Sequence, residues 1–153
     1  MEDLVTCETL EGSLRLVPRR SLRPRRTVYG LVFDRQGRLL AIALPATGKF
    51  VLPGGGVEVG ESDETALRRE VAEETGVPVE PGPVVGDSEA FYWDEPSGEA
   101  WHIYVRCLLC WATDVPSVLS QSPEGNFVWL YPAELSTEYF QGPSRHFVAS
   151  QVL

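Results

Sequence analysis

Runs of apolar residues that alternate with polar ones or lie between turn residues predict a chain rich in β-strands. The expected strands share β-branched or aromatic residues and lie at 25–33, 38–44, 50–52, 84–93, 101–113 and 127–131. The first two flank the sequence Asp-Arg-Gln-Gly at 34–37, which is typical of a hairpin turn. The pattern therefore indicates several antiparallel neighbours in one sheet.

One segment in the middle of the chain has the features of an α-helix. Ser62 is a suitable N-cap, and Gly76 suits the position just after the last helical residue, Thr75. Leu67 and Val71 are four residues apart, so they lie on one stripe that can face a core. We expect a helix over 62–75.

The chain is expected to form one domain, because 153 residues suffice for one core and no linker or repeat divides them. Two prolines interrupt any ladder in residues 1–24, which we expect to form an N-terminal arm or edge strand, with regular structure beginning at Arg25. The single domain then spans 25–153 and ends in a short helix near 143–152. Strands and helices in this order indicate a layered α/β or α+β domain with a mixed sheet.

The composition argues against several classes of partner. Thirteen basic and 22 acidic residues give a net charge of −9, which disfavours duplex nucleic acid because such binding relies on phosphate neutralisation. No apolar run approaches the roughly 20 residues of a membrane span, and the acidic N-terminus does not resemble a secretory signal. We expect a cytoplasmic protein without membrane contact, as a monomer or a homodimer.

The three cysteines do not suggest a metal site. Cys107 and Cys110 form a CxxC, but residues three apart on a strand point to opposite faces of the sheet. We expect both to be buried as apolar residues.

Three glutamates on the predicted helix are the first candidates for chemistry. Glu70, Glu73 and Glu74 lie on one side, because each helical residue rotates by about 100°. Mg²⁺ is usually held by one or two carboxylates together with waters and substrate phosphates. Just upstream, the glycines at Gly54–Gly56 allow backbone to approach a ligand closely. The alternative reading is an ordinary solvated acidic face.

The spacing of these residues carries a family resemblance. Gly55 is followed after five residues by Glu61 and after seven more by the run Arg-Glu-Val-Ala-Glu-Glu-Thr-Gly-Val at 69–77. This resembles, at every fixed position, the signature of the Nudix hydrolases, the MutT-like family. Supporting resemblance extends from about Arg25 to Leu135. It implies an α/β/α sandwich that hydrolyses a pyrophosphate bond in a nucleoside diphosphate linked to another group.

The resemblance implies a metal site made of oxygen ligands. Glu70, Glu73 and Glu74 would be metal ligands or the general base, and the Gly55 carbonyl would complete the set. The implied cofactor is Mg²⁺, with Mn²⁺ as an alternative.

It also implies catalytic and supporting roles around that metal. Glu70 is the first candidate for the general base that takes a proton from water. Arg69 would orient a glutamate by ion pairing, and Glu61 would brace the turn between loop and helix. Glu124 is a candidate late metal ligand or alternative base, with a place in a surface turn as the other reading.

The substrate is less well defined. Gly54, Gly55 and Gly56 are candidates for substrate contact, and Tyr92 and Trp129 for stacking on a base, although strand aromatics are more often core residues. Tyr92 follows Gly76 at a spacing similar to that of Nudix enzymes of dinucleoside polyphosphates. A modified nucleoside triphosphate, a nucleotide sugar and a dinucleoside polyphosphate all remain candidates.

Two other functions compete with hydrolysis. The first is a Nudix-fold regulatory module that binds a nucleotide without cleaving it, although such a module would be expected to have lost some of these carboxylates. The second is an isomerase of isoprenoid diphosphates, for which Cys107 in an apolar strand is a poor candidate.

Overall fold

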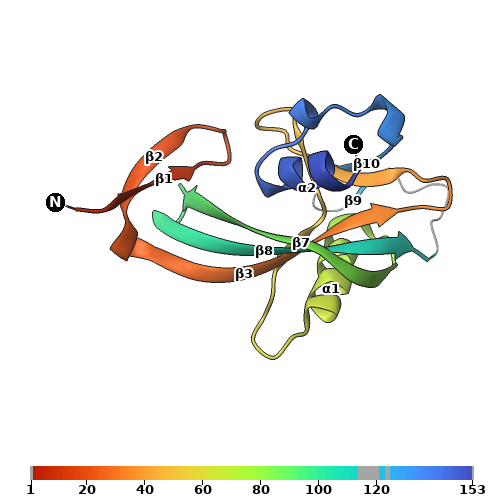
Figure 1. The fold of residues 1–153 in the computed structure, drawn as a ribbon, viewed down its shortest axis with the longest axis horizontal. Helices are drawn as coiled ribbons and strands as arrows, with labels where there is room; N and C mark the ends of the chain where they lie inside the picture. The colour runs from red at the N-terminus through yellow and green to blue at the C-terminus, as the bar shows by residue number, and fades with distance from the viewer. Residues whose placement is uncertain (1, 114–120, 123–124, 153) are drawn as a thin grey trace.

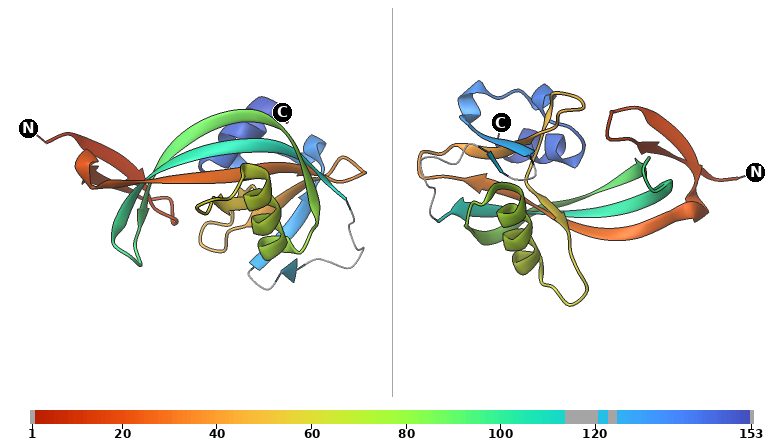
Figure 2. Two further views of the ribbon diagram at one scale, coloured as in Figure 1. Left: turned by 90° about the horizontal axis from the view of Figure 1, so that it is seen from below. Right: turned by 180° about the vertical axis from the view of Figure 1, so that it is seen from behind.

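A curved mixed β-sheet with a helix on each face forms the body of the molecule (Figures 1 and 2). The computed structural model describes residues 2–113, 121–122 and 125–152. The strands are β1 (Leu4–Glu8), β2 (Leu14–Pro18), β3 (Leu22–Phe33), β4 (Leu39–Ala43), β5 (Phe50–Val51), β6 (Gly54–Gly56), β7 (Val79–Asp94), β8 (Glu99–Ala112), β9 (Gln121–Ser122) and β10 (Gly125–Leu130). The helices are α1 (Asp63–Thr75) and α2 (Pro143–Gln151), with short 3-10 turns at Arg19–Ser21, Pro132–Glu134 and Thr137–Tyr139.

The sheet runs in the order β2-β1-β7-β8-β3-β4-β10-β9, with β5 on β4 and β6 on β3. Strands β7 and β8 form a long antiparallel hairpin, whereas β3 and β8 pair in parallel from Leu22 opposite Ala100 to Phe33 opposite Trp111. This mixture confirms the predicted sheet. Strand β6 pairs with β3 through Thr27–Tyr29, so the glycine segment, which was not among the predicted strands, is part of the sheet.

Two apolar clusters, one on each face, hold the helices against the sheet. The cluster under α1 includes Val28, Val32, Leu67, Val71 and Leu108, and the cluster under α2 includes Leu31, Leu39, Leu52, Phe140 and Phe147. Successive residues of β3 enter opposite clusters because side chains alternate across a strand. The same alternation puts Cys107 under α2 and Cys110 under α1, both buried, which confirms their predicted separation.

The local elements predicted from the sequence are confirmed. Strands β3 and β4 form the expected hairpin through residues 34–37. Helix α1 begins after Ser62, whose hydroxyl accepts a hydrogen bond from the Thr65 N–H at 3.1 Å, and ends at Gly76 with φ of 72°. Helix α2 occupies the predicted position near the end of the chain.

The expectation that regular structure begins at Arg25 is wrong. Strands β1 and β2 form a hairpin that adds to the edge of the sheet beside β7, and β3 begins at Leu22 (Figure 1). Pro24 is compatible with β3 because β8 flanks it on one side, while β6 joins the other side only at Thr27.

Among the described residues, no helix is long and apolar enough to cross a membrane.

Candidate active site

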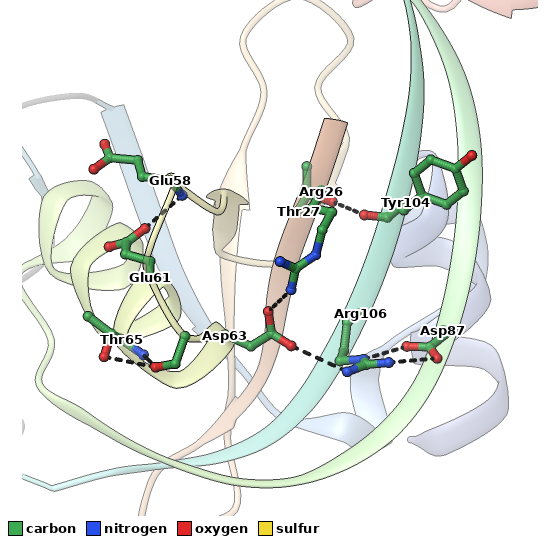
Figure 3. Close-up of polar contacts among 10 residues, drawn as sticks. Arg26, Thr27, Glu58, Glu61, Asp63, Thr65, Asp87, Tyr104 and Arg106 are labelled. Carbon is green, nitrogen blue, oxygen red and sulfur yellow. Dashed lines mark hydrogen bonds and ion pairs between the residues drawn. The ribbon is translucent and has the colours of Figure 1, made fainter. Parts of the chain in front are cut away.

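Arg69 is the centre of a network that joins α1 to the segment before it. Its Nε and Nη2 donate to the two carboxylate oxygens of Glu61, both at 2.8 Å. Nη2 also donates to the Gly56 carbonyl at 2.9 Å. Glu61 in turn accepts the Glu58 N–H at 2.9 Å (Figure 3). The two-point pairing of a planar guanidinium with a carboxylate fixes the path of the chain from β6 into the helix.

This pairing changes the proton affinity of both partners. The hydrogen bonds from Arg69, with that from the Glu58 N–H, lower the pKa of Glu61 to about 2. The hydrogen bond to Glu61 raises the pKa of the Arg69 guanidinium. The pair is therefore ionised at any pH at which the protein is handled.

The same guanidinium reaches two of the helix glutamates. Arg69 Nη1 donates to Glu70 Oε1 at 3.0 Å and lies 3.6 Å from Glu73 Oε2. The side chains of Arg69 and Glu70 are mostly buried, whereas Glu73 is about half exposed. Arg69 thus holds Glu70 in place while Glu73 faces outward one turn along the helix.

The glycines of β6 pack directly against the carboxylates. A Cβ on Gly55 would lie 2.6 Å from the Glu70 carboxyl carbon, so only glycine lets the two groups meet. The Gly54 N–H donates to Glu74 Oε1 at 2.8 Å. Gly54 has φ of 151°, and a Cβ there would overlap the Val28 carbonyl oxygen. The structure thus brings the predicted glycines and glutamates into one site.

The donor set suits a hard divalent cation that a substrate helps to bind. Within the described residues, no group of three or more histidine, cysteine or acidic side chains forms a metal cage by itself. Two carboxylates stand beside β6, since Glu70 lies against Gly55 and Glu74 accepts from the Gly54 N–H. Carboxylate oxygens suit Mg²⁺, which usually takes one or two of them and keeps waters and substrate phosphates as its other ligands.

Two residues of β3 near Gly54–Gly56 were not among the site residues named from the sequence. Arg25 belongs to an arginine-rich N-terminal segment for which phosphate contact was an alternative to a solvated arm, and Tyr29 was not considered. Tyr29 packs on Gly54, and its burial, together with the charges of Glu74 and Glu70, raises the pKa of the phenol to about 12. The Arg25 guanidinium lies against Gly56 and makes no hydrogen bond or ion pair with the residues that the structure describes. Both come from β3, and only the pairing of β3 with β6 brings them to the glycines.

A cleft of about 1360 Å³ opens beside these glycines. Its walls come from the β1–β2 hairpin, the face of β3, β7 and β8 that carries α2, the segment around Lys49, and the start of α2. Gly55, Gly56, Arg25 and Tyr29 line one part of it. The cleft therefore begins where the carboxylates meet the glycine strand.

A second polar network holds the start of α1. Asp63 accepts from Arg26 at 2.6 Å and from Arg106 at 3.4 Å, and Arg106 donates to Asp87 at 2.9 Å (Figure 3). Both arginines are substantially exposed, so these pairs add little stability. They connect the first residue of α1 to β3 and β8.

Comparison with known proteins identifies the family. A family model described as the NUDIX domain matches residues 23–151. The chain belongs to the Nudix family. Its Nudix motif is the segment from Gly55 to Val77, which includes the Arg69 network described above.

Relatives and solved structures agree with this assignment. A MutT-like protein of Streptomyces ambofaciens is 47% identical over 60 residues, which are 39% of each chain. An ADP-ribose pyrophosphatase of Methanocaldococcus jannaschii is 42% identical over 59 residues, which are 37% of this chain and 34% of that protein. The matched segments thus span less than half of these relatives. A MutT NUDIX hydrolase from Burkholderia pseudomallei is 25% identical, with a TM-score of 0.63 over 84% of this chain and 98% of that one.

The two aromatic residues predicted to contact substrate lie in different places. Tyr92 is half-buried and lines the cleft. Trp129 packs against the cluster under α1, on the other face of the Nudix sheet, and is not among the residues that line the cleft. Glu124 lies outside the described residues.

Proposed function

We propose that this Nudix protein is a hydrolase that cleaves a pyrophosphate bond in a nucleoside diphosphate linked to another group, in the presence of Mg²⁺. The observation that carries the proposal is the network in which Arg69 binds Glu61 and Glu70 and so holds a carboxylate against Gly55, at the edge of a large cleft. Any side chain at position 55 would overlap the Glu70 carboxylate. An ordinary solvated helix face does not need such a close contact between a carboxylate and a glycine backbone, whereas a metal or phosphate site does.

Glu70, Glu73, Glu74 and the Gly55 carbonyl are the groups that would hold the metal. When bound, Mg²⁺ or Mn²⁺ neutralises phosphate oxygens and lowers the pKa of a coordinated water. Glu70 is the proposed base that accepts the proton of the attacking water, because Arg69 fixes its orientation through one oxygen.

Arg25 and the glycines are the groups proposed to bind the phosphates. Arg25 lines the cleft beside Gly56 without a counter-ion among the described residues, so its charge is available to an anion. Lys49 lines the same cleft from the segment before β5. Positive charge placed next to the cleaved bond stabilises the charge that develops on the leaving phosphate.

The names of related proteins support a nucleotide substrate. One relative is called an ADP-ribose pyrophosphatase, another a MutT-like protein and a third a MutT NUDIX hydrolase. The proposed substrates are accordingly a modified nucleoside triphosphate, a nucleotide sugar, ADP-ribose or a dinucleoside polyphosphate, and the proposed partner is this small molecule alone.

The proposal is tested by incubating the full chain with representatives of these substrates, with and without Mg²⁺ or Mn²⁺, and identifying the products by chromatography. Metal-dependent release of a nucleoside monophosphate or of pyrophosphate supports a hydrolase and names its substrate. Tight nucleotide binding without cleavage by any metal would instead support the regulatory module.

A further inference from the structure

The N-terminal hairpin lies outside the matched Nudix domain, yet it forms a wall of the cleft. The family model begins at residue 23, whereas residues of β1, β2 and their connecting loop line the cavity. Figures 1 and 2 show this hairpin at the far end of β3, β7 and β8, away from α1. Whatever occupies that end of the cleft contacts an element that the matched domain does not include.

A row of side chains crosses four neighbouring strands at this end. Glu8 of β1 is opposite Tyr92 of β7, Tyr92 is opposite Trp101 of β8, and Trp101 is opposite Arg23 of β3. Residues opposite each other on paired strands share a face of the sheet. Glu8, Tyr92 and Trp101 all line the cleft. Arg23 lies over the Trp101 ring at 5.1 Å and is paired with Glu99 at 2.5 Å.

The distance along β3 between the row and Gly56 is close to the length of a nucleotide. Gly56 is opposite Thr27 on β3, and the row meets β3 at Arg23, four residues away. At about 3.3 Å per residue this separation is roughly 13 Å. Arg25 lies between them on the same face of the strand. Phosphates beside Gly56 and Arg25 therefore place the nucleoside part of an extended substrate at the row.

The charged residues of the lining also divide the cleft into a basic part and an acidic part. The lysine and arginine residues of the lining come from β3, the segment before β5, and α2: Arg25, Lys49 and Arg145. The acidic ones come from the hairpin, β7 and β8: Glu8, Glu11, Glu89, Asp94 and Glu99. A phosphate is attracted to the first group and repelled by the second.

We propose that the row binds the nucleobase by stacking on Tyr92 and Trp101, and that Glu8 selects bases that carry an exocyclic amino group over those with a keto oxygen in its place. The inference rests on the proposed function for the direction in which the substrate lies. The Glu8 side chain is half-buried and makes no hydrogen bond or ion pair within the described part of the chain. An ionised carboxylate only accepts hydrogen bonds, so an amino group satisfies it, whereas a keto oxygen would meet it acceptor to acceptor.

The test compares the binding of ADP and IDP. Their bases differ at position 6, where adenine has an amino group and hypoxanthine a keto oxygen, and at N1, which carries a hydrogen only in hypoxanthine. The diphosphate of purine riboside, which lacks the amino group and has no hydrogen on N1, is measured beside them and should bind as weakly as IDP. Dissociation constants are measured by calorimetry with Mg²⁺ on the full chain in the Glu73→Gln background, so that turnover does not consume the probes. We expect ADP to bind at least about tenfold more tightly than IDP, because a site that hydrogen-bonds an amino group rejects the analogue without it. Adding Glu8→Gln should reduce the ratio to about threefold or less, because an amide can accept or donate.

Two further variants separate this role from other effects. Glu95→Gln removes one negative charge from the exposed β7–β8 turn, outside the cleft lining, and should keep the ratio. Tyr92→Leu should weaken ADP and IDP equally, by about fivefold to a hundredfold, because every base can stack. All variants should unfold at the same temperature as the parent, within error.

Equal affinities for ADP and IDP, no binding of either, or a preference that survives Glu8→Gln would overturn the inference. The result is independent of catalysis. A preference for ADP that depends on Glu8 supports nucleobase binding at the row even if no substrate is cleaved. Metal-dependent cleavage without that preference supports the proposed hydrolase function but contradicts nucleobase selection by Glu8.

Discussion

At the scale of single residues, one arginine organises the candidate site. Arg69 contacts Glu61, Glu70 and Gly56 at once. The family resemblance predicted Arg69 and the glutamates around it as one group, and the structure has Arg69 in contact with Glu61 and Glu70. Their roles in metal binding and catalysis stay predictions. Arg25 and Tyr29 could not be predicted in this way, since they reach the site only through strand pairing.

The ionisation of Glu61 is a direct test of the Arg69 pair. Its pKa is lowered from 4.5 to about 2, mainly by the hydrogen bonds from Arg69. The stabilising effect of the pair is therefore complete above about pH 4.5 and is lost as the pH falls through about 2. Carboxyl-carbon NMR of Glu61 should show a midpoint near 2, and Arg69→Leu should return it toward the ordinary value. A midpoint near 4.5 in the parent protein would show that the pair does not form in solution.

At the scale of elements, the sequence predicts an element well when its signals lie within the segment, and poorly when the element depends on pairing with a distant strand. Helix α1 was predicted from its cap, its apolar stripe and Gly76, all of which lie within the segment. The β1–β2 hairpin and β6 were not, because their partners are distant along the chain: β1 pairs with β7, and β6 pairs with β3. For residues 1–24 the sequence predicted an arm or an edge strand, and it did not predict the hairpin partner or the pairing with β7.

The cap of α1 has a measurable effect on stability. Ser62→Ala removes the acceptor of the Thr65 N–H. We expect the free energy of unfolding to fall by about 1 kcal/mol and the melting temperature by about 2–4 °C. Urea unfolding with an unchanged slope checks this. Ser21→Ala is the control. It removes an exposed hydroxyl that donates to the Pro18 carbonyl at 2.7 Å within a 3-10 turn, and it should change stability less because water can replace an exposed partner. No change with Ser62→Ala would contradict the observed cap.

At the scale of the whole molecule, a cleft separates the N-terminal hairpin from α2, and one side chain connects its walls. Gln141 donates to the Leu10 carbonyl at 3.2 Å and accepts from the Thr47 hydroxyl at 2.9 Å. It therefore joins the tip of the hairpin to the loop before β5. The sequence could not predict this contact, because the residues lie 131 and 94 positions apart.

Loss of this connection should loosen the hairpin without disturbing the carboxylates. Gln141→Ala is expected to speed amide exchange in residues 9–13 and to raise KM for the substrate while kcat stays unchanged. The cost in stability should be small, at most about 1–2 kcal/mol for two partly exposed hydrogen bonds. Hydrogen exchange read by mass spectrometry, together with steady-state kinetics, checks this. A lower kcat at unchanged KM would contradict a role confined to the far wall.

The central claim is that the glutamates of α1 support hydrolysis, and one kinetic comparison on a single helix tests it most directly. Turnover of the cleaved substrate with Mg²⁺ is measured for the parent chain, Glu73→Gln and Glu64→Gln. Glu64 lies exposed in the first turn of α1, so its variant removes the same charge away from the site. We predict that Glu73→Gln lowers kcat by several orders of magnitude with the fold intact, whereas Glu64→Gln retains the parent rate. Parent-like turnover by Glu73→Gln would contradict the account.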